Sequence, residues 1–185
     1  MGFHTFPVER ADALEDVSRY RHLSVEELVA LLDPDGTELV ADLGSGSGFY
    51  TDDVARYVDR VLAVDLQPAM GAIYRRKGIP DNVDPVTAAA DRLPFRDDAL
   101  DAAFTTMTYH ELQSHEALVE IHRVLRPGGL FANADWTRAG RGEEGPSIEE
   151  RYDLATAEHQ LSKAGFSIEY GSERPETFVV VGVVD

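Results

Sequence analysis

A run of closely spaced glycines in the first third of the chain is well suited to bind a ligand. Residues 42–48 read DLGSGSG, and the glycines directly follow an apolar stretch, Glu38 to Leu43. Because glycine has no Cβ, the backbone there can turn sharply and come close to a bound molecule. When such a turn joins a strand to a helix, its N–H groups and the helix N-terminus face the ligand. We therefore expect a ligand site at this turn.

The spacing of the glycines differs from the pattern that binds dinucleotides. That pattern, G-x-G-x-x-G, would place its third glycine at position 49, where this chain has Phe49. About 20 residues beyond the glycines, Asp65 ends a second apolar stretch, and a carboxylate there can accept hydrogen bonds from both hydroxyl groups of a ribose. We expect an adenosine-containing ligand that lacks the usual pyrophosphate.

A second polar group follows the apolar stretch at residues 100–106. It contains His110 and Glu111. In a parallel α/β sheet, ligands bind beyond the carboxyl ends of the strands. His110 is a candidate general base for a hydroxyl or amine, and Glu111 would orient it or bind a cation. The alternative is that both residues only cap and hydrogen-bond the loop.

Strand and helix patterns alternate along the chain, which predicts an α/β fold. Strands are expected at residues 38–43, 60–65, 84–88, 100–106, 130–134, 166–170 and 177–184. Helices are expected from the capping box at Ser24 to about residue 33, at 50–58, 68–77 and 153–164, and from Ser114 until Pro127-Gly128-Gly129 stops that helix. Residues 138–145 are expected to be a flexible polar loop. The last two strands should pair antiparallel, because their connection is too short for a crossover helix.

Composition narrows the class of protein. The chain has 185 residues, 43% of them hydrophobic, and the 34 acidic and 17 basic residues give a net charge of −17 with only two lysines, Lys77 and Lys163. An acidic surface repels phosphate backbones and anionic membranes, so we expect neither as a partner. The balance is typical of proteins from salt-loving organisms; the alternative is an ordinary acidic bacterial protein.

The chain contains no cysteine, which excludes disulfides, thiolate zinc sites and a cysteine nucleophile. Its histidines, His4 among them, show no metal-ligand spacing, so we predict no metal. No apolar run approaches the roughly 20 residues that cross a bilayer, and residues 1–10 lack the pattern of a signal peptide. We expect a cytoplasmic protein.

The sequence resembles the class I S-adenosylmethionine-dependent methyltransferases, particularly the small single-domain group with the methyltransferase type 11 pattern. Four motifs in order carry the resemblance: VADLGSGSGFYT at residues 40–51, VD at 64–65, ADRLPF with DDALD between 90 and 101, and LRPGGL at 125–130. It implies a single domain over residues 1–185, with a lid over 1–35 and a nucleotide-binding core over 36–185. The implied fold is Rossmann-like: a doubly wound, mostly parallel seven-stranded sheet with helices on both faces and a C-terminal antiparallel hairpin.

The resemblance also implies S-adenosylmethionine as cofactor, S-adenosylhomocysteine as product and a small-molecule acceptor. The glycine turn would hold the methionine part of the cofactor through the backbone of Gly44, Ser45 and Gly46. Asp42 would bind its ammonium group directly or through water, and Gly48 would be a further cofactor-binding residue of the turn. A merely structural role for these glycines, in packing a helix on a strand, is the alternative.

Further positions follow from the same resemblance. Asp65 would bind the ribose hydroxyls and Leu66 would flank the adenine, whose amino group would meet Asp91 and whose ring nitrogen would meet the amide of Arg92. Thr106 and Met107 would line the sulfonium and the methyl group that is transferred. Tyr20 and Arg21 would belong to the lid that folds over the cofactor. The alternatives are a helix-capping role for Asp65, a turn role for Asp91 and a plain surface pair at Tyr20 and Arg21.

Two other functions stay open. An NAD-dependent oxidoreductase would share the first two strands and Asp65, but the glycine spacing and the turn at Asp91 count against it. A non-catalytic regulatory protein would keep the S-adenosylmethionine site and lack a productive acceptor pocket, and the short chain leaves few residues to build one.

Overall fold

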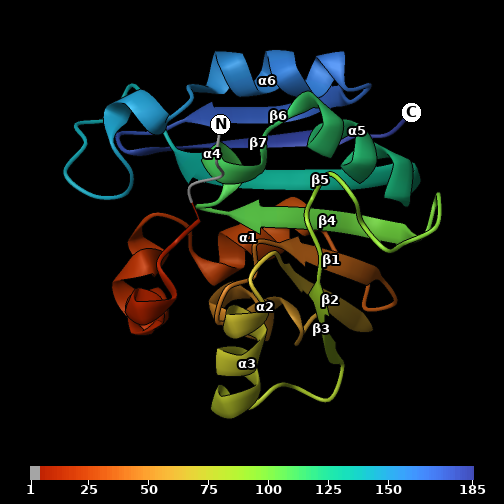
Figure 1. Ribbon diagram of the computed structural model, residues 1–185. Helices are drawn as coiled ribbons and strands as arrows, with labels where there is room; N and C mark the ends of the chain where they lie inside the picture. The colour runs from red at the N-terminus through yellow and green to blue at the C-terminus, as the bar shows by residue number, and fades with distance from the viewer. Residues whose placement is uncertain (1–4) are drawn as a thin grey trace.

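The computed structural model describes residues 5–185, and one mixed sheet runs through its centre (Figure 1). The sheet has seven strands in the order β3-β2-β1-β4-β5-β7-β6. The first five in this order are parallel, whereas β7 is antiparallel to both β5 and β6. The strands are β1 Leu39–Leu43, β2 Arg60–Asp65, β3 Val83–Thr87, β4 Leu100–Thr106, β5 Leu125–Trp136, β6 Ser167–Glu173 and β7 Thr177–Val183. The expected fold class, including the C-terminal hairpin, is confirmed.

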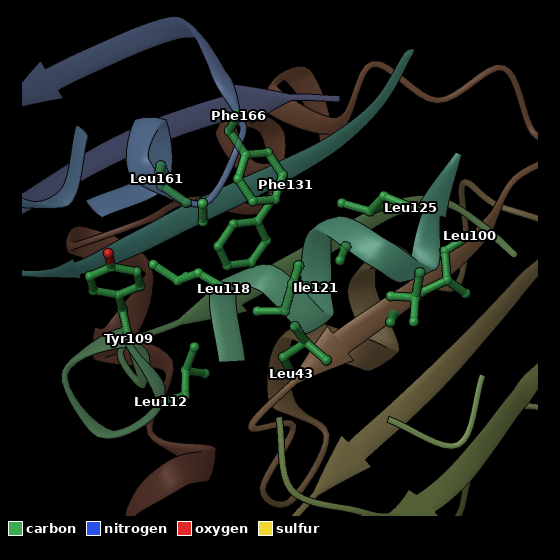
Figure 2. Packing of buried hydrophobic residues seen from close by; sticks show 14 of the residues in the cluster. Leu43, Leu100, Tyr109, Leu112, Leu118, Ile121, Leu125, Phe131, Leu161 and Phe166 are labelled. Atoms are coloured by element: carbon green, nitrogen blue, oxygen red, sulfur yellow. The ribbon is translucent and has the colours of Figure 1, made fainter. Parts of the chain in front are cut away.

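Helices cover both faces of this sheet. The α-helices are α1 Val25–Leu32, α2 Phe49–Val54, α3 Pro68–Lys77, α4 Tyr109–Leu112, α5 His115–Val124 and α6 Leu154–Lys163, and the 3₁₀ helices are η1 Val8–Glu15, η2 Val17–Arg21 and η3 Ile148–Glu150. One buried cluster joins α5 and α6 to the sheet, and a second joins α1, α2 and α3 to the opposite face. Figure 2 shows the first cluster, with Leu118 and Ile121 of α5 beside Phe131 of β5. The two clusters hold the strand ends in fixed positions.

The order of the strands places a crevice at one edge of the sheet. From β1 the chain adds β2 and β3 on one side, and it then returns to add β4 on the other side of β1. The segments that follow β1 and β4 therefore diverge, and ligands bind at such a switch point. In Figure 1 the red N-terminal segment lies at this end of the sheet, beyond the arrowhead of β4.

Several helix boundaries follow from local capping. The side chain of Ser24 accepts a hydrogen bond from the amide of Glu27 at 3.2 Å, and that of Ser114 accepts one from Ala117 at 3.1 Å. Both serines satisfy amides that a helix N-terminus otherwise leaves without acceptors. The expected starts of α1 and α5 are confirmed.

Three details differ from the sequence-based expectation. Helix α5 ends at Val124, before Pro127, because Leu125 is extended and pairs with Leu100 to begin β5 early. Residues 109–112 form the short helix α4 where a loop was expected. Helix α2 ends at Val54, four residues before the expected end at residue 58, and Tyr57, which lies beyond the helix, is 46% exposed. Within residues 5–185, no helix has the length and hydrophobicity needed to cross a bilayer.

Candidate functional site

A cavity of about 730 Å³ opens at the carboxyl ends of β1, β2 and β4. Its walls come from the glycine turn, the segment 88–91, helix α4, the 3₁₀ helices η1 and η2, and the loop that precedes η3. It brings together these residues from the sequence prediction: Arg21, Asp42, Gly44, Ser45, Gly46, Asp65, Leu66, Asp91, Thr106, Met107, His110 and Glu111. The other three, Tyr20, Gly48 and Arg92, are not among the described residues that line it.

The glycine turn is shaped by its neighbours. The amides of Gly44 and Ser45 donate to the carbonyl oxygen of Val64 at 2.9 and 3.0 Å, which ties the end of β1 to β2. Gly44 has a φ of +79°, and a Cβ there would collide with the side chain of Thr108. Glycine is required at this position for the turn to lie against the end of β4.

Gly48 serves packing. Its φ is +81°, and a Cβ there would overlap the ring of Tyr74, a fully buried side chain of α3. Glycine at this position therefore has a packing role, whether or not the turn also contacts a cofactor.

Asp42 presents an unsatisfied oxygen at the wall of the cavity. The residue is 2% exposed, and its Oδ2 accepts a hydrogen bond from Oγ1 of Thr51 at 2.5 Å. Its Oδ1 is buried and has no hydrogen-bond partner within residues 5–185. Burial raises the pKa of Asp42 to about 7, and the hydrogen bond from Thr51 opposes that rise. A buried carboxylate oxygen without a donor is suited to receive the ammonium group of a ligand.

Asp65 is held in place by two backbone amides. Its Oδ2 accepts from Gly46 at 2.9 Å and its Oδ1 accepts from Gln67 at 2.8 Å. Burial raises the pKa of Asp65, and the two amide hydrogen bonds oppose that rise. Each carboxylate oxygen can accept more than one hydrogen bond, so a pair of ribose hydroxyls fits this group while the amides fix its orientation.

The adenine end of the cavity differs in one respect from the sequence prediction. Leu66, 45% exposed, lines the cavity together with Ala88 to Asp91. The amide of Arg92 donates instead to the carbonyl oxygen of Ala89 at 3.1 Å and closes a turn. The structure does not support the expected contact between this amide and a ring nitrogen of adenine.

The N-terminal segment lies over the cavity, but with different contacts from those expected. Tyr20 turns away: its hydroxyl donates to Asp53 Oδ2 at 2.6 Å and its ring packs on Phe49. The tyrosine therefore braces the segment and does not line the cavity. Arg21 does line it, and its guanidinium pairs with Glu144 at 2.5 Å.

At the end of β4 the backbone adopts an uncommon conformation. Met107 has a φ of +57°, and its amide donates to the carbonyl oxygen of Ala134 at 2.7 Å. Residues other than glycine rarely adopt this region, and such strain is concentrated at functional sites. Thr106 and Met107 both line the cavity, next to α4.

His110 is held by a carboxylate on the neighbouring strand. Its Nδ1 lies 2.9 Å from Oδ2 of Asp135, and its Nε2 lies 3.8 Å from Oε1 of Glu111. Burial lowers the pKa of His110, but the carboxylates of Asp135, Glu111 and Glu150 outweigh burial and raise it. Burial raises the pKa of Glu111 to about 7, and His110 opposes that rise. This end of the cavity can therefore take up and release protons near neutral pH.

Two residues of the site were missed from the sequence. Asp135 follows the apolar stretch 130–134, and the rule that selected Asp65 at the end of a strand applies equally to it. Arg19 lines the cavity with its guanidinium 4.9 Å from the centre of the Phe49 ring, and its Nη1 donates to the carbonyl oxygen of Leu14. No sequence pattern at Arg19 indicates that it belongs to the site. Within residues 5–185, no three acidic or histidine side chains are arranged to hold a metal ion; His4 lies outside this range.

Comparison with known proteins gives one family and several relatives. The model of the methyltransferase domain family matches residues 41–133. An uncharacterized methyltransferase-like protein of Schizosaccharomyces pombe is 34% identical over 96 residues, which are 51% of this chain and 37% of that protein. The sterol 24-C-methyltransferase of Eremothecium gossypii is 30% identical over 159 residues, which are 75% of this chain and 43% of that protein. The chain thus spans less than half the length of these two relatives.

One solved structure is similar along its whole length. The crystal structure of a SAM-dependent methyltransferase from Aquifex aeolicus superposes with a TM-score of 0.89 and 27% sequence identity. The match covers 98% of this chain and 100% of that one.

Proposed function

The chain belongs to the methyltransferase domain family, and from that membership we propose that it is an S-adenosylmethionine-dependent methyltransferase that acts on a small molecule. One observation carries the proposal. Oδ1 of Asp42, which has no hydrogen-bond partner among the described residues, lies in the wall of a cavity that also holds the glycine turn, Asp65 and His110. An ammonium group, a ribose and a reacting centre would each find a complementary group there.

The residues fit the proposed cofactor from one end to the other. Asp42 would hold its ammonium group, Asp65 its ribose hydroxyls, and Leu66 and Asp91 its adenine. When bound, S-adenosylmethionine supplies a methyl group on a positively charged sulfur that leaves as a neutral thioether. Thr106 and Met107 would form the wall beside that group.

The size and charge of the site favour a small acceptor. A cavity of about 730 Å³ must accommodate both cofactor and acceptor, and ligand pockets of roughly 300–1,000 Å³ hold small molecules. The net charge of −17 disfavours nucleic acid and anionic membranes as partners. His110 would remove a proton from the acceptor where the reaction requires it, and the walls would align donor and acceptor and exclude water. The buried pair of His110 and Asp135 favours a catalytic role over a regulatory one.

Calorimetry on the purified protein tests the identity of the cofactor. S-adenosylmethionine and S-adenosylhomocysteine should bind with a Kd on the order of 1 µM or lower, because the buried Asp42 and the partly buried Asp65 would each form charge-assisted hydrogen bonds with the ligand. NAD should bind far more weakly, because the glycine spacing does not form a pyrophosphate turn. Equal affinity for NAD would contradict the proposal.

Replacing Asp65 with alanine should weaken S-adenosylmethionine binding by about tenfold or more. The carboxylate would accept two ribose hydroxyls, and each charge-assisted hydrogen bond contributes about 1.5–3 kcal/mol. Titration calorimetry measures the change, and circular dichroism checks that the variant is folded. Asp59→Ala, which removes an exposed carboxylate outside the cavity, should bind as the wild type does. Unchanged affinity in folded Asp65→Ala would mean that this carboxylate only fixes the turn through Gly46 and Gln67.

We also propose that the protein works in the cytoplasm of a salt-loving organism. Salt should then raise its melting temperature, because it screens the repulsion among the excess acidic side chains. The increase should continue from about 0.1 M to above 1 M salt, where the Debye length has fallen to about 3 Å. Differential scanning calorimetry across this range is the measurement. A melting temperature that does not change with salt would argue for an ordinary acidic protein.

A further inference from the structure

A buried carboxylate on β5 gathers three N–H groups at the acceptor end of the cavity. Oδ2 of Asp135 accepts from the amide of His110 at 2.7 Å and lies 2.9 Å from Nδ1 of the same residue. Oδ1 accepts from the amide of Trp136 at 2.7 Å. Asp135 is 1% exposed, so this carboxylate is shielded from bulk water and its position is fixed by the backbone on both sides.

This arrangement determines which nitrogen of His110 carries the proton. A carboxylate accepts hydrogen bonds, so the ring nitrogen that faces it must be N–H. Nδ1 of neutral His110 is therefore protonated, and Nε2 carries the lone pair. His110 lines the cavity, and its side chain is only 12% exposed, so the pair lies at the wall and is largely closed to solvent.

We propose that Asp135 is a positioning residue, which holds His110 with Nδ1 protonated so that Nε2 takes the proton of a hydroxyl or ammonium group on the methyl acceptor. This inference rests on the proposed function. Asp135 touches no reactant in this scheme; it acts through the imidazole, which alone meets the acceptor.

The step balances in atoms and charge. The acceptor's O–H or N–H bond breaks, its proton goes to Nε2, and the lone pair of the acceptor forms the new bond to the methyl carbon. The electron pair of the broken carbon–sulfur bond stays on sulfur. The imidazolium that results lies beside the carboxylates of Asp135, Glu111 and Glu150, and these three groups stabilise its positive charge.

The same charges restrict the class of acceptor. The described groups that act on His110 from β5, α4 and η3 are all carboxylates. A neutral alcohol or phenol, or a cationic amine, can approach such a surface, whereas an acceptor with a carboxylate or phosphate beside its nucleophile is repelled. The inferred acceptor is therefore a protic nucleophile without a negative charge beside the atom that meets His110; Arg19 and Arg21, which also line the cavity, allow negative charge elsewhere on the acceptor.

NMR of the ¹⁵N-labelled protein tests the inference without any ligand. Long-range ¹H–¹⁵N spectra distinguish a protonated from an unprotonated ring nitrogen, and the His110→Gln variant identifies the signals of His110 by their loss. In the wild type above the pKa of His110, Nδ1 should be protonated and Nε2 unprotonated. The opposite tautomer in the wild type would overturn the inference, and this arm requires no Asp135 variant to fold.

Asp135→Asn gives the second arm. The asparagine side chain has one acceptor oxygen in place of two and carries no charge, so the preference of His110 for protonated Nδ1 should weaken, and the pKa of His110 should decrease because only Glu111 and Glu150 still offset burial. Glu111→Gln, the matched control, should keep the Nδ1–H tautomer. If Asp135→Asn folds and keeps the tautomer and pKa of the wild type, Asp135 does not position His110.

With an acceptor in hand, turnover separates positioning from structure. Asp135→Asn should lower the turnover number by about 10²–10⁴-fold, and it should slow the His110→Ala variant no further. Additive losses in the double variant would assign Asp135 a structural role alone. Because the NMR arms use no cofactor, their failure is distinct from failure of the proposed function, which calorimetry with S-adenosylmethionine reports separately.

Discussion

Replacing His110 with alanine should lower the turnover number for methyl transfer by about 10²–10⁴-fold, the usual contribution of a general base. The imidazole lines the acceptor end of the cavity, next to Met107 at the end of β4. It is held there by Asp135, so its removal deletes the proton acceptor without disturbing the glycine turn or Asp65. Affinity for S-adenosylmethionine, measured by calorimetry, should therefore stay within about twofold of the wild-type value.

Two further variants sharpen this result. His115→Ala removes an exposed histidine five residues away that lies outside the cavity lining, and it should leave turnover unchanged. Glu111→Gln should cause a smaller loss than His110→Ala, because Glu111 lies 3.8 Å from Nε2 and assists the imidazole only through its charge. Full turnover in His110→Ala would show that the histidine is structural and that catalysis depends on alignment or on another base.

Replacing Asp42 with asparagine should have two opposite effects. Affinity for S-adenosylmethionine should fall by about 10- to 100-fold, because a charge-assisted hydrogen bond worth about 1.5–3 kcal/mol is lost. Above pH 7, however, the ligand-free variant should be more stable than the wild type. Calorimetry measures the affinity, and thermal unfolding at several pH values measures the stability.

The sign of the stability effect follows from linkage. The pKa of Asp42 is raised from 3.8 to about 7 in the folded protein. Between these values the unfolded chain releases a proton that the folded protein retains, so the ionised carboxylate opposes folding increasingly as pH rises and fully above pH 7. The difference corresponds to a penalty on the order of 4 kcal/mol. Asparagine keeps an acceptor for Thr51 and carries no charge, so it removes the penalty.

Asp53 provides the matched control for Asp42. It is 6% exposed and lies outside the cavity, where it accepts the hydroxyl hydrogen of Tyr20. Asp53→Asn should therefore leave S-adenosylmethionine affinity unchanged. Our assignment of Asp42 to the ammonium group would be wrong if Asp42→Asn bound the cofactor as tightly as the wild type. The pKa argument would be wrong if the variant were no more stable than the wild type at pH 8.

Regular elements were predictable where the apolar pattern alone determines them. The bounds of β2, α3 and β4 agree with the sequence prediction because the two strands are short, mostly apolar runs and the helix begins with a helix-initiating proline. The end of α5 was not predictable in this way, because Leu125 has an apolar side chain that suits a helix and a strand equally well. Only its pairing with Leu100 on β4, a tertiary contact, makes it a strand residue.

In the candidate site, too, some residues could be predicted from the sequence, and others depend on tertiary contacts. Residues attached to the ends of predicted strands, such as Asp42 and Asp65, lie together in one cavity, as their strand positions predict. The strand-end rule could have selected Asp135, but its pairing with Nδ1 of His110 could not be predicted, because the two residues are 25 apart in sequence and meet only across β4 and β5. The contact of Tyr20 with Asp53, 33 residues away, depends on tertiary packing, and the turn that the Arg92 amide closes depends on local backbone geometry; residue type specifies neither.

The ion pair of Arg21 and Glu144 joins two parts of the chain that are 123 residues apart, and both lie outside the stretch matched by the family model. Together with η1 and η2, they form the roof of the cavity, whereas its floor, from the glycine turn to the end of β4, lies inside that stretch. His110 and Glu111, at the proposed acceptor end, lie inside the matched stretch as well. A relative that shares only this stretch would therefore share the groups proposed for the methyl donor, but only part of the surface that an acceptor would meet.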